Sequence, residues 1–307
     1  MMKPGFESLL DLAKEIAADR RAPLPSVIKE VMHYEIVQAL IESGAARNLV
    51  FQGGTALRLC YDGNRYSEDL DFAGGVKFDA SVMDGFVESL VGNVGKAYGL
   101  TVEIDQRMPD QTDSVPVGRW RSKILLPQQD RSLKQAYTIH LEVAEIPAYT
   151  REVRLVRPMP FAAAYSYRSL MLSTESRQEI LADKIVALGG RKYLKHRDLW
   201  DIHMLSQSNT PLDVGMVVSK IADYHLAVGD FLGTLGARID RMGHPETRSA
   251  FQKEMSRFLD GNLQQFLQDK SFVDQVFGTA AVMMQDVTSQ IAERDEAEKR
   301  PNSFRMR

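Results

Sequence analysis

Apolar positions recur along the chain with two different spacings, and the change between them falls near the middle. Up to about residue 146, segments of helical spacing alternate with short segments in which apolar and polar residues take turns, as in half-buried strands. Beyond about residue 160 the spacing is helical. Within the first part of the chain, the expected helices are 5–19, 26–44 and 80–97. The expected strands are 49–51, 69–72, 101–106, 120–126 and 137–146.

This pattern predicts an α+β fold. The N-terminal part is expected to form a mixed β-sheet with flanking helices, and the C-terminal part a helical bundle. Two prolines, Pro158 and Pro160, separate the two kinds of pattern. We therefore expect two domains, 1–158 and 159–307, with the chemistry in the cleft between them.

Composition narrows the class of protein without naming an activity. With 307 residues, 44% of them hydrophobic and 26% charged, the chain can bury a sizeable core. No apolar run is as long as a membrane span, and the first residues lack the apolar core of a signal peptide. The single cysteine, Cys60, excludes an intrachain disulfide and fits a reducing compartment. We expect a cytoplasmic protein that contacts no membrane.

The overall charge constrains nucleic-acid binding only in part. The net charge of −3 argues against a protein that coats nucleic acid through bulk charge. A local basic patch could still bind a nucleic-acid substrate.

A glycine turn follows the first expected strand. Leu49 to Phe51 is a short apolar run that ends at Gly53-Gly54, and Thr55 stands where the N-cap of the next helix belongs. Such a turn leaves backbone N–H groups free at the positive end of a helix dipole. The segment therefore predicts a phosphate site at Gly53, Gly54 and Thr55.

Two aspartates lie on the next expected strand. Asp69 and Asp71 are two residues apart, so their carboxylates share one face of a strand, while Leu70 and Phe72 point into the core. Adjacent carboxylates repel each other unless a cation lies between them, and their hard oxygen atoms suit Mg²⁺. A phosphate site followed by such a pair predicts metal-assisted nucleotidyl transfer. The alternative is a β-hairpin with a solvated acidic face.

Periodicity places two further charged side chains. Within 137–146, Glu142 lies opposite the apolar face, on the same side as the aspartate pair, whereas Glu145 falls on the other side. The alternative for Glu142 is an exposed glutamate on an edge strand. Lys184 falls inside the apolar stripe of the helix expected at 177–189. It either extends its ammonium group to solvent or reaches a buried anion.

A basic run follows this helix. Between Lys184 and Asp198 the charged lysine and arginine residues have no acidic neighbour: Arg191, Lys192, Lys195 and Arg197. Tyr193 and Trp200 interleave with them. This combination suits a nucleotide or a single-stranded end, whose bases stack and whose phosphates pair with cations. The alternative is a solvated, charged linker.

These motifs together resemble the polymerase β-like nucleotidyltransferase superfamily and, within it, the AbiEii/MenT group of nucleotidyltransferase toxins. The resemblance covers roughly residues 45 to 205. It rests on Gly53-Gly54-Thr55 with Arg65-x-Ser67-x-Asp69-x-Asp71, on Glu179 and Lys184 of a Glu-x-x-x-x-Lys helix, and on Arg197-Asp198-x-x-Asp201.

The resemblance implies a role for each matched residue. Asp69 and Asp71, with Glu142 as a third carboxylate, would hold two Mg²⁺ ions. Lys184 would neutralise the phosphates of a nucleoside triphosphate and would belong to the catalytic set with Asp198. The remaining phosphate contacts would come from Gly53, Gly54, Thr55, Arg65 and Ser67.

The resemblance also implies a biological setting. The chain would be the toxin of a toxin–antitoxin pair, with a cognate antitoxin protein as its partner. It would transfer nucleotides to an RNA acceptor such as the tRNA 3′ end, gripped by Arg191, Lys192, Lys195 and Arg197. Nucleotidylation of a protein or of a small molecule such as an aminoglycoside stays open, as does a catalytically inactive nucleotide-binding regulator.

Overall fold

One mixed sheet lies at the centre of the part of the chain that the structure describes. The computed structural model describes residues 6–99, 101–105, 118–125, 138–158 and 169–299. Within these ranges the seven-stranded sheet has the order β3-β4-β5-β2-β1-β7-β6. Strand β1 is parallel to β7 and β2 is parallel to β5, whereas the other neighbours are antiparallel. The strands are β1 Val50–Gln52, β2 Leu70–Ala73, β3 Thr101–Asp105, β4 Arg119–Leu125, β5 Thr138–Ala144, β6 Glu152–Leu155 and β7 Met171–Thr174.

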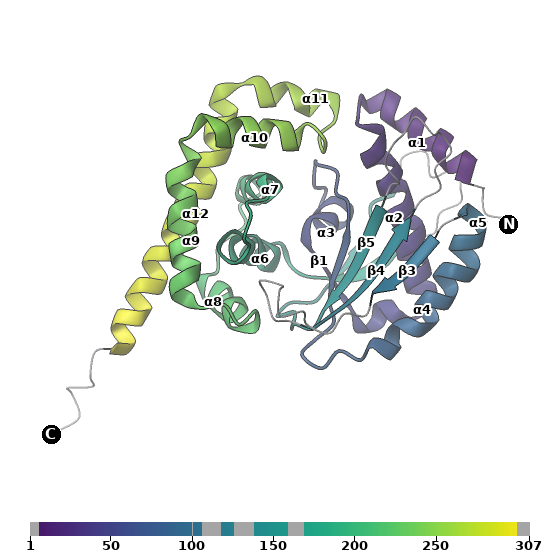
Figure 1. The fold of residues 1–307 in the computed structure, drawn as a ribbon, viewed down its shortest axis with the longest axis horizontal. Coiled ribbons are helices and arrows are strands. Elements are labelled where there is room, and N and C mark those ends of the chain that lie inside the picture. Colours follow the sequence, from purple (N-terminus) through teal and green to yellow (C-terminus); the bar gives the residue numbers. More distant parts are fainter. Residues whose placement is uncertain (1–5, 100, 106–117, 126–137, 159–168, 300–307) are drawn as a thin grey trace.

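Helices flank the sheet on both sides (Figure 1). The N-terminal helices α1 Phe6–Arg20, α2 Leu24–Glu42, α4 Asp84–Ser89 and α5 Lys96–Tyr98 lie together on the side drawn at the right. The opposite side carries α3 Gly53–Cys60, α6 Arg177–Gly190, α7 His196–Gln207, α8 Val214–Asp223, α9 Val228–Met242, α10 Pro245–Met255, α11 Gly261–Gln264 and α12 Lys270–Lys299. This arrangement confirms the predicted α+β class. Among the described residues, no helix combines the length and apolar character needed to cross a membrane.

Strict alternation gives the sheet one apolar and one polar face. On β4 every second side chain is buried, and Trp120 meets Phe86 of α4 with ring centroids 6.5 Å apart. On β2 and β5 the apolar residues Leu70, Phe72 and Leu141 are likewise buried. The side chains between them point to the other face, because successive strand residues point to opposite sides. That polar face is turned toward α6 and α7.

Two helical predictions differ from the structure in detail. The pattern predicts that the second helix begins at Ser26, but α2 begins at Leu24 with Pro23 as its N-cap. Pro25 then lies in the first turn of α2, where proline is tolerated because its missing N–H would have no intrahelical partner. The helix expected at 80–97 is a chain of short segments: η2 Ala80–Met83, α4, the π-helical η3 Leu90–Gly95, and α5.

Strands β6 and β7 are absent from the sequence prediction. Strand β7 pairs with β1 through Phe51 and Thr174, and β6 pairs with β7 at the sheet edge. The sheet therefore takes a strand from beyond the domain boundary expected near Pro158, and the division into 1–158 and 159–307 stays a prediction. The predicted strands are otherwise present, while residues 106, 126 and 137 lie outside the described ranges.

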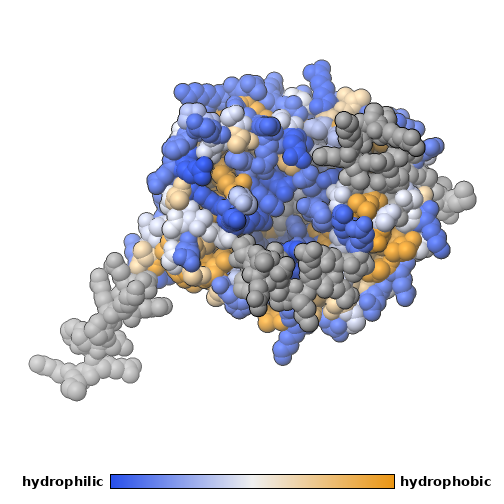
Figure 2. Space-filling model, viewed as in Figure 1, coloured by the Kyte–Doolittle hydropathy of each residue, from blue (hydrophilic) through white to orange (hydrophobic). Residues whose placement is uncertain are grey.

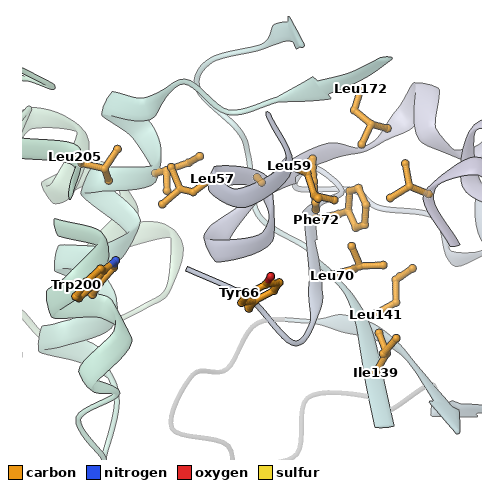
Figure 3. Packing of buried hydrophobic residues seen from close by; sticks show 14 of the residues in the cluster. Leu57, Leu59, Tyr66, Leu70, Phe72, Ile139, Leu141, Leu172, Trp200 and Leu205 are labelled. Atoms are coloured by element: carbon orange, nitrogen blue, oxygen red, sulfur yellow. The ribbon is translucent and has the colours of Figure 1, made fainter. Parts of the chain in front are cut away.

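Helix α3 packs between the sheet and α7 (Figure 3). Leu57 points toward Leu205 of α7, while Leu59 lies on the side of Phe72. Leu59, Phe72 and Leu205 are all buried in the main core. The glycine turn that opens α3 is consequently fixed from both sides.

Candidate active site

A single polar cleft collects nearly all of the residues predicted to act. It measures ≈ 1090 Å³ and lies between the polar face of the sheet and helices α6 and α7. Figure 2 shows mainly hydrophilic residues around a hollow at the centre of this face. Of the predicted site residues, Thr55 alone is not part of its lining; the others are Gly53, Gly54, Arg65, Ser67, Asp69, Asp71, Glu142, Lys184, Arg191, Lys192, Lys195, Arg197 and Asp198.

The glycine turn approaches the carboxylate strand closely. Gly53 has a φ of 77°, and a Cβ atom there would lie 3.1 Å from Asp71 Oδ2. A Cβ atom on Gly54 would lie 2.3 Å from Arg65 Nη2 and 3.2 Å from Ser67 Oγ. Both positions therefore require glycine, the first for its backbone conformation and the second for space.

The predicted N-cap role of Thr55 is wrong. Helix α3 begins at Gly53, its N-cap is Gln52, and no side chain caps it. Thr55 is fully buried, and its hydroxyl donates to the backbone carbonyl of Asp69. Thr55 therefore joins α3 to β2 from below the cleft. A direct contact between its side chain and a nucleotide stays a prediction.

Two of the three predicted metal ligands, Asp71 and Glu142, lie on the adjacent central strands β2 and β5, and Asp69 directly precedes β2. Asp71 of β2 is the register partner of Glu142 of β5, so both side chains share the polar face, as the alternation predicted. Asp69 Oδ1 accepts from the backbone N–H of His140, and His140 Nδ1 lies 3.2 Å from the same oxygen. Glu142 is engaged by Arg119 Nη1 at 3.3 Å and Arg121 Nε at 2.7 Å.

The aspartate pair fits a divalent cation by its chemistry. Burial, together with the negative charges of Glu142 and Asp69, raises the pKa of Asp71 to about 6. Crowded oxygen donors with an uncompensated charge are what Mg²⁺ binds. Among the described residues, however, no three His, Cys, Asp or Glu side chains are placed to hold a metal together. Glu142 is held by its arginines, so Mg²⁺ binding and the number of ions stay predictions.

Lys184 does reach a buried anion, and the anion belongs to the protein. Its ammonium group lies 2.8 Å from Asp198 Oδ1 and 2.8 Å from Asp201 Oδ2. Burial alone would raise the pKa values of these two carboxyl groups. The charge of Lys184, with those of Arg191 and Arg65, outweighs burial and lowers both pKa values. Lys184 lines the cleft but is already paired.

Arg65 completes this buried cluster. Its Nε and Nη2 atoms donate to the two carboxylate oxygens of Asp201, each at 2.6 Å, and Nη1 donates to the carbonyl of Tyr66 at 2.8 Å. Such a bidentate pair fixes both partners in orientation. Arg65 thereby holds α7 against the segment before β2, and a direct phosphate contact by Arg65 stays a prediction.

The basic run forms one wall of the cleft. Lys192, Tyr193 and Lys195 are exposed, and all three line the cleft. Arg191 donates to Asp198 at 2.7 Å, and Arg197 donates to Glu68 at 2.9 Å.

The expectation that Trp200 is available for stacking is wrong. Trp200 is buried, donates to Asn64 Oδ1 at 2.9 Å and packs against Phe272. Tyr193, which is 72% exposed, is the aromatic residue of this wall that can stack with a base.

Glu179, the other half of the lysine-helix motif, lies away from the reacting groups. It is fully buried and accepts hydrogen bonds from the backbone N–H groups of Tyr149 and Thr150 at 2.8 and 2.6 Å. Lys220 Nζ lies 2.9 Å from Oε1 of Glu179, the oxygen that also accepts from Tyr149. Glu179 therefore anchors the loop before β6 to α6.

The sequence interpretation missed a second basic wall. Arg119, Arg121 and Lys123 alternate with buried residues on β4, and all three line the cleft opposite α6 and α7. The signal is visible in the sequence, since cations occur there at every second position of a predicted strand.

Comparison with known proteins places this geometry in a family. The model of the family described as "Nucleotidyl transferase AbiEii toxin, Type IV TA system" matches residues 35–280. A search of curated proteins found no match. Among solved structures, MenT4, a nucleotidyltransferase toxin from Mycobacterium tuberculosis H37Rv, is similar with a TM-score of 0.56 and 18% identity, over 94% of this chain and 96% of that one.

A second solved structure, JHP933 from Helicobacter pylori, matches with 18% identity and a TM-score of 0.41, over 87% of this chain and 95% of that one. The family model spans most of the sequence and includes the glycine turn, the aspartate pair, Lys184 and Asp198. The chain therefore belongs to the AbiEii family of nucleotidyltransferase toxins.

Proposed function

We propose that this toxin transfers a nucleotide from a nucleoside triphosphate to the terminal hydroxyl of an RNA acceptor such as the tRNA 3′ end. The observation that carries the proposal is the composition of one cleft. A glycine turn, an aspartate pair and exposed basic and aromatic residues all line it. Its volume of ≈ 1090 Å³ exceeds what most single small ligands fill, which leaves room for a nucleotide and an acceptor end together.

The nucleotide is assigned to the side of α3. There the backbone N–H groups of Gly53 and Gly54 begin a helix, and no Cβ atom stands in the way of a phosphate. Ser67 Oγ lies beside Gly54. Lys184 stands behind this position and holds Asp198 and Asp201, which in turn orient Arg191 and Arg65.

Asp69, Asp71 and, after rearrangement, Glu142 would hold Mg²⁺ at the reacting phosphate. When bound, Mg²⁺ would activate the attacking hydroxyl and stabilise the charge on the pyrophosphate leaving group. The chain's own contribution is positional. Register pairing of β2 with β5 fixes Asp71 beside Glu142, and His140 orients Asp69.

The acceptor is assigned to the exposed basic wall. Lys192 and Lys195 carry charges that no neighbouring carboxylate pairs among the described contacts, and Tyr193 offers a ring on which a base can stack. An RNA end needs only a few such contacts, so the acidic net charge of the chain is compatible with it.

A transfer assay tests the proposal directly. The purified protein is incubated with each labelled nucleoside triphosphate and total cellular RNA, with and without Mg²⁺. We expect Mg²⁺-dependent labelling of tRNA by the wild type, none by Asp71→Asn, and full labelling by Asp11→Asn, a matched change at an exposed position of α1. Labelling of protein in place of RNA would make a protein acceptor the better assignment.

A growth assay tests the biological setting. Expression without an antitoxin should arrest bacterial growth, and Asp71→Asn should remove the arrest. Extracted tRNA should carry extra 3′ nucleotides. Lys192→Glu with Lys195→Glu should prevent this extension while triphosphate binding persists. Arrest with unmodified tRNA ends would refute the tRNA assignment.

A further inference from the structure

The basic wall on β4 has the form of a track. Arg119, Arg121 and Lys123 point to the same face of the strand, because the residues that alternate with them, Trp120, Ser122 and Ile124, are buried on the other face. Neighbouring cations of the row stand about 6.6 Å apart along the strand, twice the rise per residue. This spacing lets successive cations contact successive phosphates of an extended strand.

The two arginines of the row share a single carboxylate. Glu142 lies 3.3 Å from Arg119 Nη1 and 2.7 Å from Arg121 Nε, and the three side chains are between one fifth and about one quarter exposed. Lys123, the third cation of the row, is paired with Glu103 of β3 at 3.2 Å, so all three cations hold carboxylates that a phosphate would displace. The Nε atom of Arg119 is buried and has no hydrogen-bond partner among the described residues. The guanidinium group therefore keeps hydrogen-bonding capacity that Glu142 does not use.

The strand order tells which substrate meets this row. From the glycine turn, the sheet runs through β1, β2 and β5 to β4, so the aspartate pair lies between the turn and the row. In phosphoryl transfer, the attacking and leaving oxygens stand roughly in line on opposite sides of the reacting phosphorus. A triphosphate at the glycine turn places its leaving group on that side, and the acceptor then arrives from the side of β4.

We propose that Arg119, Arg121 and Lys123 bind backbone phosphates of the acceptor nucleic-acid strand, and that the two arginines exchange Glu142 for a phosphate when the strand arrives. This inference rests on the proposed function, since it adds β4 to the surface at Lys192 and Lys195 that is assigned to the acceptor. The exchange frees Glu142 to face Asp71, its register partner across β2 and β5. Arrival of the acceptor would thereby let Glu142 join Asp69 and Asp71 as the third carboxylate.

Binding measurements test the track. A fluorescein-labelled single-stranded RNA ending in C-C-A is titrated with the full-length protein at several salt concentrations. Arg121→Gln and Lys123→Gln should each weaken binding about tenfold, the loss of one charge-assisted contact. Each should also reduce the slope of log Kd against log salt by about 0.7. Arg241→Gln, an exposed position of α9 outside the cleft, should change neither.

A double-mutant cycle tests the exchange. Glu142→Gln removes the carboxylate that competes with phosphate for the arginines, so RNA affinity should rise several-fold. In the Arg121→Gln background the same change should give a smaller gain, because the shorter of the two pairs that compete with phosphate is already broken and only the pair with Arg119 remains. Removal of a negative charge that acts only through the general field would raise affinity equally in both backgrounds, and that result would overturn the exchange.

A third experiment tests whether the row binds phosphates of the acceptor or phosphates of the nucleotide. Affinity for each nucleoside triphosphate is measured by calorimetry for the same variants, and we expect it to be unchanged. If triphosphate affinity falls while RNA affinity does not, the row binds the nucleotide and the inference is wrong.

If wild type binds RNA and the β4 variants bind it equally well, only this inference fails. If wild type does not bind RNA at all, the proposed function fails with it. Thermal melts of each variant confirm that the fold is retained.

Discussion

Lys184 illustrates how a single residue depends on its buried partners. The ammonium group bridges Asp198 and Asp201, and the three side chains are nearly inaccessible to solvent. Removing one member of such a cluster leaves charges that are buried and only partly compensated. The sequence identified Lys184 by its place in an apolar stripe, but periodicity could not tell whether the anion was a substrate phosphate or a carboxylate from the next helix.

We predict that Lys184→Met lowers the free energy of unfolding by about 3 kcal/mol or more. Loss of the lysine charge should also raise the pH at which the protein unfolds in acid. Asp198 and Asp201 have lowered pKa values in the folded state, so their contribution is present above the unfolded pKa and is lost as pH falls through the folded values. Urea titrations at several pH values measure both effects. Lys192→Met, an exposed change in the following turn, is the control, and equal midpoints for the two variants would contradict the prediction.

Asp71 gives the opposite pH dependence. Its pKa is raised from 3.8 to about 6, so the folded state binds the proton more tightly than the unfolded state. Wild type therefore gains stability as pH falls from about 6 to about 4. Asp71→Asn should be more stable than wild type above pH 6 without metal, by at most about 3 kcal/mol, and the difference should shrink toward pH 4.

Thermal melts across this pH range measure the difference for Asp71→Asn. Added Mg²⁺ should raise the melting temperature of wild type more than that of the variant. A stability difference that stays constant from pH 4 to pH 7 would contradict the raised pKa.

At the scale of elements, α3 and β2 act as one unit. The hydroxyl of Thr55 in α3 donates to the carbonyl of Asp69, next to β2, inside the core. The glycine turn and the aspartate pair are therefore linked by a direct hydrogen bond as well as by apolar packing. Neither can shift without the other.

We predict that Thr55→Val lowers the free energy of unfolding by about 1–2 kcal/mol, because the shape is kept and a buried carbonyl loses its donor. It should also weaken nucleotide affinity, since the turn is no longer tied to the strand. Chemical denaturation and calorimetry measure the two quantities. Thr234→Val removes a similar hydroxyl contact at a partly exposed position of α9 and should leave nucleotide affinity unchanged. Unaltered nucleotide binding by Thr55→Val would show that the turn holds its position without this contact.

The sequence predicted strands well where alternation is regular and poorly where it is short. Strands β4 and β5 alternate over seven residues each, and both were predicted. Strands β6 and β7 have four residues each, and β7 owes its place to pairing with β1, far away in sequence. Sequence periodicity contains no information on such a partner, so the edge of the sheet could not be predicted.

At the scale of the whole molecule, the cleft exists because the two halves are tied together beside it. Arg65 binds Asp201, Arg197 binds Glu68, and Trp200 binds Asn64. Each of these bonds joins α7 to the segment between α3 and β2. The partners are 129 to 136 residues apart in the sequence, so only the fold makes them neighbours.

These ties predict that the two halves unfold together. The chain has two tryptophans, Trp120 in β4 and Trp200 in α7, so each half carries its own fluorescent reporter. The Trp120→Phe variant is followed through Trp200, and the Trp200→Phe variant through Trp120. Within each variant, the fluorescence transition in urea should coincide with the transition measured by circular dichroism. Separate fluorescence and circular dichroism midpoints within one variant would indicate that 1–158 and 159–307 unfold independently.

The central position of β2 has a consequence for how the protein opens. Strand β2 is hydrogen-bonded on both sides, by β1 and by β5, whereas the wall at 191–195 is a non-helical, largely exposed segment. Amide hydrogen exchange should therefore be slowest around Leu70 and Phe72 and fast at Lys192 and Tyr193. The wall at Lys192 and Tyr193 can thus fluctuate many times while β2 stays paired, and Asp71 keeps its place beside Glu142 until the sheet itself comes apart.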